Sequence, residues 1–194
     1  MSEMLSRYLH FFWAGLSKHG QTGGIIPSQR FLIDKMLAPL PEDFSGRCIE
    51  LGPGSGALTV RLAAKCPAAQ IIACEINPVL ARDTRNLMLR RGLSGQVEVI
   101  NQPAEKLLAS IASSGEPLPQ FIISGIPLGT LSEAKTFLLL DAIRDALPEG
   151  GMYIQFQHSL VDRKRIRSRF ARFRSVPVFL NFPPAVIYYA QKEL

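Results

Sequence analysis

The chain has 194 residues, of which 47% are hydrophobic, a composition that supplies the core of one domain and excludes an intrinsically disordered protein. No apolar run reaches the roughly 20 residues that span a bilayer, and the first residues lack the layout of a signal peptide. We therefore expect a cytoplasmic protein. Its formal net charge of +6 favours an anionic partner.

The first predicted element is an amphipathic helix over residues 5–16. Its apolar positions recur at helical spacing and include three aromatic residues. Such a helix either packs on the domain or lies in a membrane interface, where Trp and Phe favour the headgroup boundary. The apolar face consists of Leu5, Tyr8, Leu9, Phe12, Trp13 and Leu16.

A glycine-rich loop over residues 21–28 follows the first helix. It contains Gly23-Gly24-Ile25-Ile26-Pro27-Ser28, and Ser28 is a predicted N-cap for a helix over residues 29–37. We expect residues 1–27, the helix and the loop, to belong to the same domain as the rest of the chain.

The next segment is a short buried strand that breaks into a glycine turn. Glu50 lies near the end of the strand, and Gly52, Gly54 and Gly56 follow at alternate positions before a helix over residues 58–65. Glycine lets the backbone adopt positive φ and approach a ligand closely, and the helix that follows presents its N-terminus to the ligand.

A second apolar run, residues 70–75, ends in Glu75, which lies 19 residues after Gly56. In a doubly wound α/β fold, an acid about 20 residues past the glycine turn lies at the tip of the second strand, where it accepts hydrogen bonds from ribose hydroxyls. The turn and the acid together predict an adenosine-containing cofactor.

The rest of the chain alternates between helices and strands. Helices are predicted over residues 78–91, 105–112, 132–147 and 163–174, and strands over residues 96–100, 120–124, 152–157, 176–180 and 185–189, the last two as an antiparallel hairpin. This order predicts a single Rossmann-like α/β domain, residues 1–194, with a seven-stranded sheet, a reversed edge and helices on both faces. None of the three cysteines, Cys48, Cys66 and Cys74, has metal-site spacing, so we expect free thiols and no metal.

Ligands bind outside the carboxyl ends of the strands in an open α/β sheet. The residues that follow the first four strands should therefore line one cofactor site. They are Glu50, Gly52, Pro53, Gly54, Ser55, Gly56, Glu75, Ile76, Gln102, Pro103, Ala104 and Ser124.

The pattern Glu-x-Gly-x-Gly-x-Gly resembles the first motif of class I S-adenosylmethionine-dependent methyltransferases. The resemblance implies S-adenosyl-L-methionine as cofactor and S-adenosyl-L-homocysteine as product. It implies that Glu50 steadies the glycine loop and the methionine end of the cofactor. Gln102 lies near the position where these enzymes often carry an aspartate that bonds the adenine amino group.

The segment Ser124-Gly125-Ile126-Pro127-Leu128 lies where amino methyltransferases carry Asn-Pro-Pro-Tyr or a variant of it. There, an amide side chain and a backbone carbonyl accept hydrogen bonds from the target nitrogen, so that catalysis is mainly positioning. In this chain Ser124 replaces the amide and Leu128 replaces the aromatic residue, so a flipped base loses its stacking partner. This difference makes a nucleic acid the less favoured substrate.

Three stretches together resemble the soluble bacterial phospholipid N-methyltransferases, which methylate phosphatidylethanolamine. They are residues 23–28 after the aromatic helix, residues 124–128, and residues 181–185 before Tyr188-Tyr189. The resemblance implies an enzyme on the inner face of the membrane. We expect Ser124, Gly125, Ile126, Pro127 and Tyr188 to be catalytic, Tyr188 through a cation–π contact with the ammonium; a structural role for this tyrosine is the alternative.

The predicted helix over residues 163–174 carries seven basic side chains. It is either a solvated charged face or a surface that binds an anionic bilayer, and a nucleic acid backbone would attract the same charges. His19 is a candidate proton acceptor for the amine. The predicted substrate and membrane contacts are Trp13, His19, Ile25, Pro27, Ser28, Arg163, Arg167 and Arg174.

Two other functions stay open at the level of sequence. His19-Gly20-Gln21 with Phe31-Leu32 also resembles the start of the rRNA adenine dimethylases, although that family carries a further helical domain. The other alternative is a catalytically idle protein of the same fold that only binds a membrane or partner, against which the intact Glu50, glycines and Glu75 argue.

Overall fold

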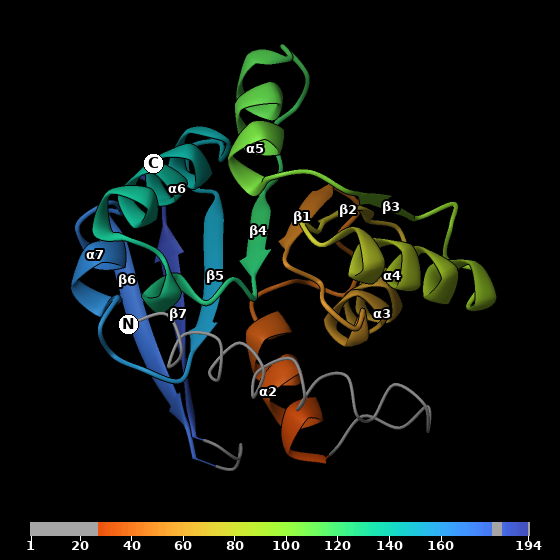
Figure 1. The fold of residues 1–194 in the computed structure, drawn as a ribbon, viewed down its shortest axis with the longest axis horizontal. Helices are drawn as coiled ribbons and strands as arrows, with labels where there is room; N and C mark the ends of the chain where they lie inside the picture. Colours follow the sequence, from red (N-terminus) through yellow and green to blue (C-terminus); the bar gives the residue numbers. More distant parts are fainter. Residues whose placement is uncertain (1–26, 180–183, 194) are drawn as a thin grey trace.

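The structure is a computed structural model that describes residues 27–179 and 184–193, with no side chain described for residues 27 and 28. The predicted helix of residues 5–16, with Trp13, and the predicted contacts His19 and Ile25 lie outside these residues. Seven strands form one sheet (Figure 1). They are β1 (Arg47–Leu51), β2 (Gln70–Cys74), β3 (Val97–Ile100), β4 (Phe121–Ser124), β5 (Met152–Gln157), β6 (Arg172–Val178) and β7 (Ala185–Gln191).

The strand order is β3-β2-β1-β4-β5-β7-β6. The first five strands are parallel, and β7 runs antiparallel to both β5 and β6. This order confirms the predicted seven-stranded Rossmann-like sheet with its reversed edge. Because β1 lies between β2 and β4, the direction of winding changes between β1 and β4, and ligand sites of open α/β sheets lie at such a point.

Helices cover both faces of the sheet. They are α2 (Pro27–Leu37), α3 (Ala57–Lys65), α4 (Pro78–Arg90), α5 (Ala104–Ser113), α6 (Glu133–Asp145) and α7 (Arg163–Arg167), with a 3-10 turn η1 (Leu128–Thr130). One buried cluster joins α2, α3 and α4 to the sheet, and a second joins α5, α6 and α7 to it. Neighbouring strand residues alternate between the two clusters: Ile122 belongs to the second and Ile123 to the first.

Two predicted boundaries are wrong. Ser28 is not the N-cap of α2, because Pro27 is already the first helical residue, a position where proline is well tolerated. The helix predicted over residues 163–174 ends at Arg167, and Arg172 opens β6 by pairing with Gln191 of β7. Pairing with β7 prevails over the helical spacing of Ile166, Phe170 and Phe173, since the edge strand satisfies a whole row of backbone groups.

Within residues 27–179 and 184–193, no helix is both long and apolar enough to cross a membrane. The three cysteines are buried free thiols, as the sequence predicts.

Candidate functional site

The glycine turn after β1 adopts a conformation that requires its glycines. Gly52, Gly54 and Gly56 have φ values of 72°, 57° and 78°, and no other residue type in the described chain has positive φ. The Gly52 amide donates to the Cys74 carbonyl of β2 at 2.9 Å, and the Thr84 hydroxyl of α4 donates to the Gly54 carbonyl at 2.8 Å. The turn is therefore fixed to β2 and to α4, and its backbone is open to close approach by a ligand.

Gly56 provides a test of this packing. An added Cβ at Gly56 would lie 3.0 Å from Leu87 Cδ2 and 3.3 Å from Thr84 Cγ2. Gly92, with φ of +68°, has no atom within 4 Å of an added Cβ. Both alanine variants incur the left-handed backbone cost of about 1–2 kcal/mol. We expect Gly56→Ala to lose about 1–3 kcal/mol more because of crowding, as measured by urea denaturation. Equal losses at the two positions would contradict the packing argument.

Glu75 connects the ends of β1 and β2. Its side chain is 2% exposed. Its Oε2 accepts from the Gly54 amide at 3.2 Å, and its Oε1 accepts from the Asn77 amide at 2.9 Å. Burial raises the pKa of Glu75, and these backbone donors partly offset the rise. The carboxylate therefore lies at the glycine turn, where the sequence analysis requires it for contact with a ribose.

Glu50 lies beneath the turn with only 2% of its surface exposed. Its Oε2 atom is buried and has no hydrogen-bond partner among the described residues. Burial raises the pKa of Glu50 from 4.5 to about 8; the Thr59 hydroxyl lowers it, and the neighbouring Glu75 charge raises it slightly further. A buried carboxylate oxygen without a partner is costly. This atom is therefore suited to receive a cation, and the ammonium of an amino acid moiety is one.

The tips of β2 and β3 are held together by Asn101, a residue that the sequence analysis did not select. Its Nδ2 donates to the carbonyls of Glu75 at 2.7 Å and Ile76 at 3.0 Å. The feature of the sequence that could have identified Asn101 is its position directly after the third strand. Gln102 is half-buried and its carbonyl accepts from the Cys74 thiol at 3.3 Å, while Ile76 is 68% exposed.

The structure brings the predicted cofactor residues to one edge of the sheet. The strands that carry them are paired there: Leu51 at the end of β1 lies opposite Cys74 of β2 and Ser124 of β4. The residues gathered at this edge are Glu50, Gly52, Pro53, Gly54, Ser55, Gly56, Glu75, Ile76, Gln102, Pro103, Ala104 and Ser124.

Residues 124–128, which we call the acceptor loop, lie directly against the glycine turn. The Gly125 amide donates to the Leu51 carbonyl at 2.9 Å. A Cβ on Gly125 would lie 3.1 Å from the Gly52 carbonyl, so the two turns approach at backbone distance. Ser124 is fully buried, and its hydroxyl accepts from the Ile126 amide at 3.1 Å. The Ser124 side chain therefore shapes the loop and presents no surface to an acceptor.

Two glutamines of β5 hold the acceptor loop in place, and neither is predicted from the sequence. Gln155 and Gln157 donate to the Ile126 carbonyl at 3.0 Å and 3.3 Å. The Tyr153 hydroxyl in turn donates to Gln155 Oε1 at 2.5 Å. The feature of the sequence that could have identified them is the occurrence of polar residues at alternate positions of an otherwise apolar strand. This network fixes the carbonyl of Ile126 beside the glycine turn.

The ring of Tyr188 has no face that is open toward the acceptor loop. It is fully buried, its ring stacks on Phe173 at 5.6 Å, and its hydroxyl donates to the Ser159 carbonyl at 3.3 Å. Burial raises its pKa to about 12. Tyr189 belongs to the opposite cluster, where its hydroxyl donates to the Lys35 carbonyl. The structural alternative for Tyr188 is therefore the one that the packing supports, and an ammonium has no access to its ring.

The predicted basic surface is divided by the fold. Arg163 and Arg167 lie on α7, whereas Arg174 lies on β6 with its guanidinium carbon 4.8 Å from the ring centroid of Tyr189. Tyr189 packs on the α2 face of the sheet and α7 on the opposite face.

Pro27 and Ser28 form the first turn of α2. No group of three or more His, Cys, Asp or Glu suited to a metal occurs in the part of the chain that the structure describes.

Curated proteins with similar sequences are methyltransferases. The chain is 32% identical over 162 residues to the ribosomal RNA small subunit methyltransferase A of Streptococcus uberis, covering 77% of this chain and 51% of that protein. The corresponding protein of Geobacillus thermodenitrificans is 29% identical over 86% of this chain and 54% of its own length. An arginine N(omega)-methyltransferase of Streptomyces achromogenes is 31% identical over half of this chain and 26% of its own. The chain thus spans about half the length of the ribosomal RNA methyltransferases it matches.

No family model matches the chain. Among solved structures, an S-adenosylmethionine-dependent O-methyltransferase of Thermotoga maritima has a TM-score of 0.66 at 16% identity, over 94% of this chain and 71% of its own. A 16S rRNA N2 G1207 methyltransferase of Thermus thermophilus, solved with S-adenosylmethionine and guanosine, has a TM-score of 0.66 at 18% identity, over 89% of this chain and 44% of its own. With the sheet order and the glycine turn described above, these likenesses show that the chain has the class I S-adenosylmethionine-dependent methyltransferase fold.

Proposed function

We propose that the chain is an S-adenosylmethionine-dependent N-methyltransferase. The observation that carries this proposal is the convergence of Glu75, the positive-φ glycine turn and the unpartnered Glu50 Oε2 at the end of β1. Glu75 is placed to accept from ribose hydroxyls, the backbone of Gly52–Gly54 to lie against the cofactor, and Glu50 to receive its ammonium. When bound, S-adenosylmethionine supplies an activated methyl on a sulfonium. The curated relatives named above are methyltransferases, which supports methyl transfer as the chemistry.

The residues of this chain contribute mainly orientation to the reaction. The Ile126 carbonyl is rigid because two glutamines bind it, and it lies at the turn that holds the cofactor. A carbonyl oxygen accepts at two lone pairs, and the two glutamines occupy both on Ile126, so this carbonyl fixes the loop beside the glycine turn. The acceptor loop carries no acidic or basic side chain, so the acceptor nitrogen must arrive in its neutral form.

For the acceptor we propose the headgroup amine of phosphatidylethanolamine. The acceptor loop supports this choice, because it provides neither a side-chain amide nor an exposed aromatic ring: Ser124 and Leu128 are both fully buried. A flipped base needs a stacking surface and partners for its Watson–Crick edge, whereas a primary amine needs only a small acceptor. The sequence resemblance to phospholipid N-methyltransferases points to the same substrate.

The second candidate acceptor is an adenine in ribosomal RNA. The curated relatives favour it over the lipid, since those that match over most of this chain are named as ribosomal RNA methyltransferases. The net charge of +6 suits either acceptor, because phosphate groups surround both.

A labelled-methyl assay decides between the two acceptors. The protein is incubated with labelled S-adenosylmethionine and, in separate reactions, with phosphatidylethanolamine liposomes and with deproteinised small-subunit ribosomal RNA. We expect label in the lipid fraction and none in the RNA. Label in the RNA alone would reject the lipid substrate and establish the second candidate. Cofactor binding by calorimetry without transfer to either would reject both acceptors while leaving the cofactor site supported.

A further inference from the structure

The arginines on helix α7 and directly after it are of two kinds. Arg165 is paired with Asp162 at 2.8 Å and with Glu133 at 3.7 Å, and Arg169 is paired with Asp141 at 2.8 Å. Arg163 and Arg167 are exposed and make no ion pair with any described residue. They are four residues apart, so they project from the same side of the helix. The helix therefore presents two positive charges that the neighbouring carboxylates do not neutralise.

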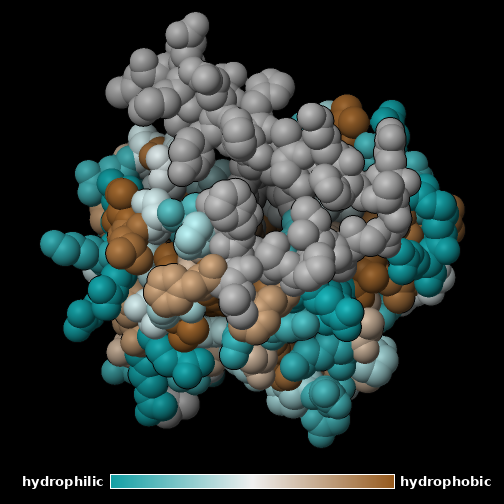
Figure 2. Space-filling model, turned by 90° about the horizontal axis from the view of Figure 1, so that it is seen from below, coloured by the Kyte–Doolittle hydropathy of each residue, from teal (hydrophilic) through white to brown (hydrophobic). Residues whose placement is uncertain are grey.

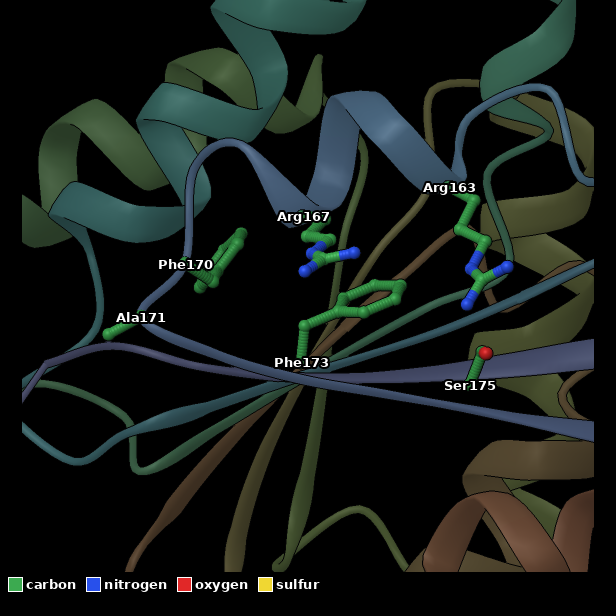
Figure 3. Close-up of a pocket in the computed structure, with 6 residues that line it drawn as sticks. All are labelled: Arg163, Arg167, Phe170, Ala171, Phe173 and Ser175. Atoms are coloured by element: carbon green, nitrogen blue, oxygen red, sulfur yellow. The ribbon is translucent and has the colours of Figure 1, made fainter.

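These two arginines line a cavity of about 390 Å³ between α7 and β6. Figure 3 shows both side chains extending from the helix toward the strand, Arg167 over the ring of Phe173 and Arg163 over Ser175. No carboxylate lines the cavity. Its walls are Arg163, Arg167, Phe170, Ala171, Phe173 and Ser175.

The floor of the cavity is firmly held. Phe173 and Ser175 are alternate residues of β6 and face the helix together. The ring of Phe173 rests on the buried ring of Tyr188, with 5.6 Å between centroids and 27° between planes. Phe170 is 7% exposed and stacks on Tyr153. The aromatic floor of the cavity is thus a preformed part of the fold.

We propose that this cavity binds the phosphate of an anionic phospholipid and so seats the protein on a membrane. Two guanidinium groups and a hydroxyl match the oxygens of a phosphate diester, because arginine donates in a planar fork and serine adds a single donor. None of the residues that line the cavity belongs to the acceptor loop, so the cavity is a docking site and not a second acceptor site.

Exposed apolar residues beside the cavity favour a lipid over RNA as the source of the phosphate. Leu160 and Val161 lie three and two residues before the start of α7 and are 63% and 65% exposed. Seen from below, the molecule presents hydrophobic and hydrophilic groups side by side (Figure 2). Apolar side chains next to cationic ones fit the boundary between headgroups and acyl chains, whereas an RNA backbone gives Leu160 and Val161 no apolar partner. The choice of a membrane rests on the proposed lipid substrate.

The test uses a monomeric ligand, dihexanoyl phosphatidylglycerol, so that the general charge of a membrane surface does not contribute. We expect Arg163→Ala/Arg167→Ala to weaken its binding about tenfold or more, since two charge-assisted contacts are lost. The matched control is Lys164→Ala/Arg172→Ala, which removes the same charge from exposed residues of the same segment outside the cavity. The control should bind within about twofold of the unchanged protein.

Three measurements keep the outcomes separate. Equal weakening in both double variants, or in neither, would overturn the cavity as the site. A short RNA that binds in the unchanged protein and is lost only in Arg163→Ala/Arg167→Ala, without any lipid binding, would overturn the lipid as ligand. Binding of S-adenosylmethionine and methyl transfer are measured on the same proteins; their absence together with intact lipid binding would reject the proposed function and leave the docking site standing.

Discussion

Replacing Glu75 with glutamine is expected to lower the affinity for S-adenosylmethionine about a hundredfold, as measured by isothermal titration calorimetry. Both carboxylate oxygens already accept backbone hydrogen bonds, from Gly54 at 3.2 Å and Asn77 at 2.9 Å. An amide has one acceptor oxygen and a donor group, so it cannot keep both bonds and also accept from a ribose. Each charge-assisted bond contributes about 1.5–3 kcal/mol, and the loss of one or two gives an effect of this size.

The matched control for this variant is Glu98→Gln. Glu98 is an exposed carboxylate of β3, outside the glycine turn, and its loss should leave cofactor affinity unchanged. Circular dichroism separates a loss of binding from a loss of folding. Full affinity in a folded Glu75→Gln protein would remove Glu75 from the cofactor site, and the adenosine-binding interpretation of this sheet edge would have to be abandoned.

The second large effect is expected at Glu50, where replacement by glutamine should raise the stability of the protein without cofactor. Burial raises the pKa of Glu50 from 4.5 to about 8. The folded protein therefore holds a proton that the unfolded chain releases above pH 4.5. The stability that this proton contributes is fully present below the unfolded pKa and is lost as pH rises toward 8. Without cofactor, Glu50→Gln should therefore be more stable than the unchanged protein near pH 8.

The size of this gain follows from the shift. Each pKa unit corresponds to about 1.4 kcal/mol, so the difference between the two proteins should grow by about that amount for each pH unit above 4.5 and level off near pH 8. Urea denaturation at several pH values measures it. A Glu50→Gln variant that is equally destabilised at pH 5 and pH 8 would mean that Glu50 is ionised in the folded protein without cofactor.

Cofactor binding should respond at the same residue. An ammonium beside the unpartnered Glu50 Oε2 favours the ionised carboxylate. Binding near neutral pH should therefore release a proton, seen as a dependence of the calorimetric enthalpy on the ionisation enthalpy of the buffer. A stability gain combined with weaker binding in Glu50→Gln would identify a group held in an unfavourable site because the ligand requires it.

The sequence alone determined the fold class and the cofactor edge. Three local features carry this information: the alternation of strands and helices, the glycines of the turn, and the spacing of Glu75. Each depends only on the chemistry of the residues and on the number of residues between elements. The carboxyl ends of parallel strands must meet, so Glu50, Gly54 and Glu75 could be placed together without coordinates. The antiparallel final strands could be predicted for the same reason, since a short connection permits little else.

Only the tertiary structure decided how the second half of the chain is used. The spacing of Ile166, Phe170 and Phe173 favoured one long helix, but pairing with β7 converts residues 172–178 into a strand and separates Arg174 from Arg163 and Arg167. Tyr188 became a core residue because β7 lies between two strands and is covered on both faces. The support of Ile126 by Gln155 and Gln157 depends on the pairing of β4 with β5. Long-range pairing and burial set these outcomes, and neither is encoded in the spacing of neighbouring residues.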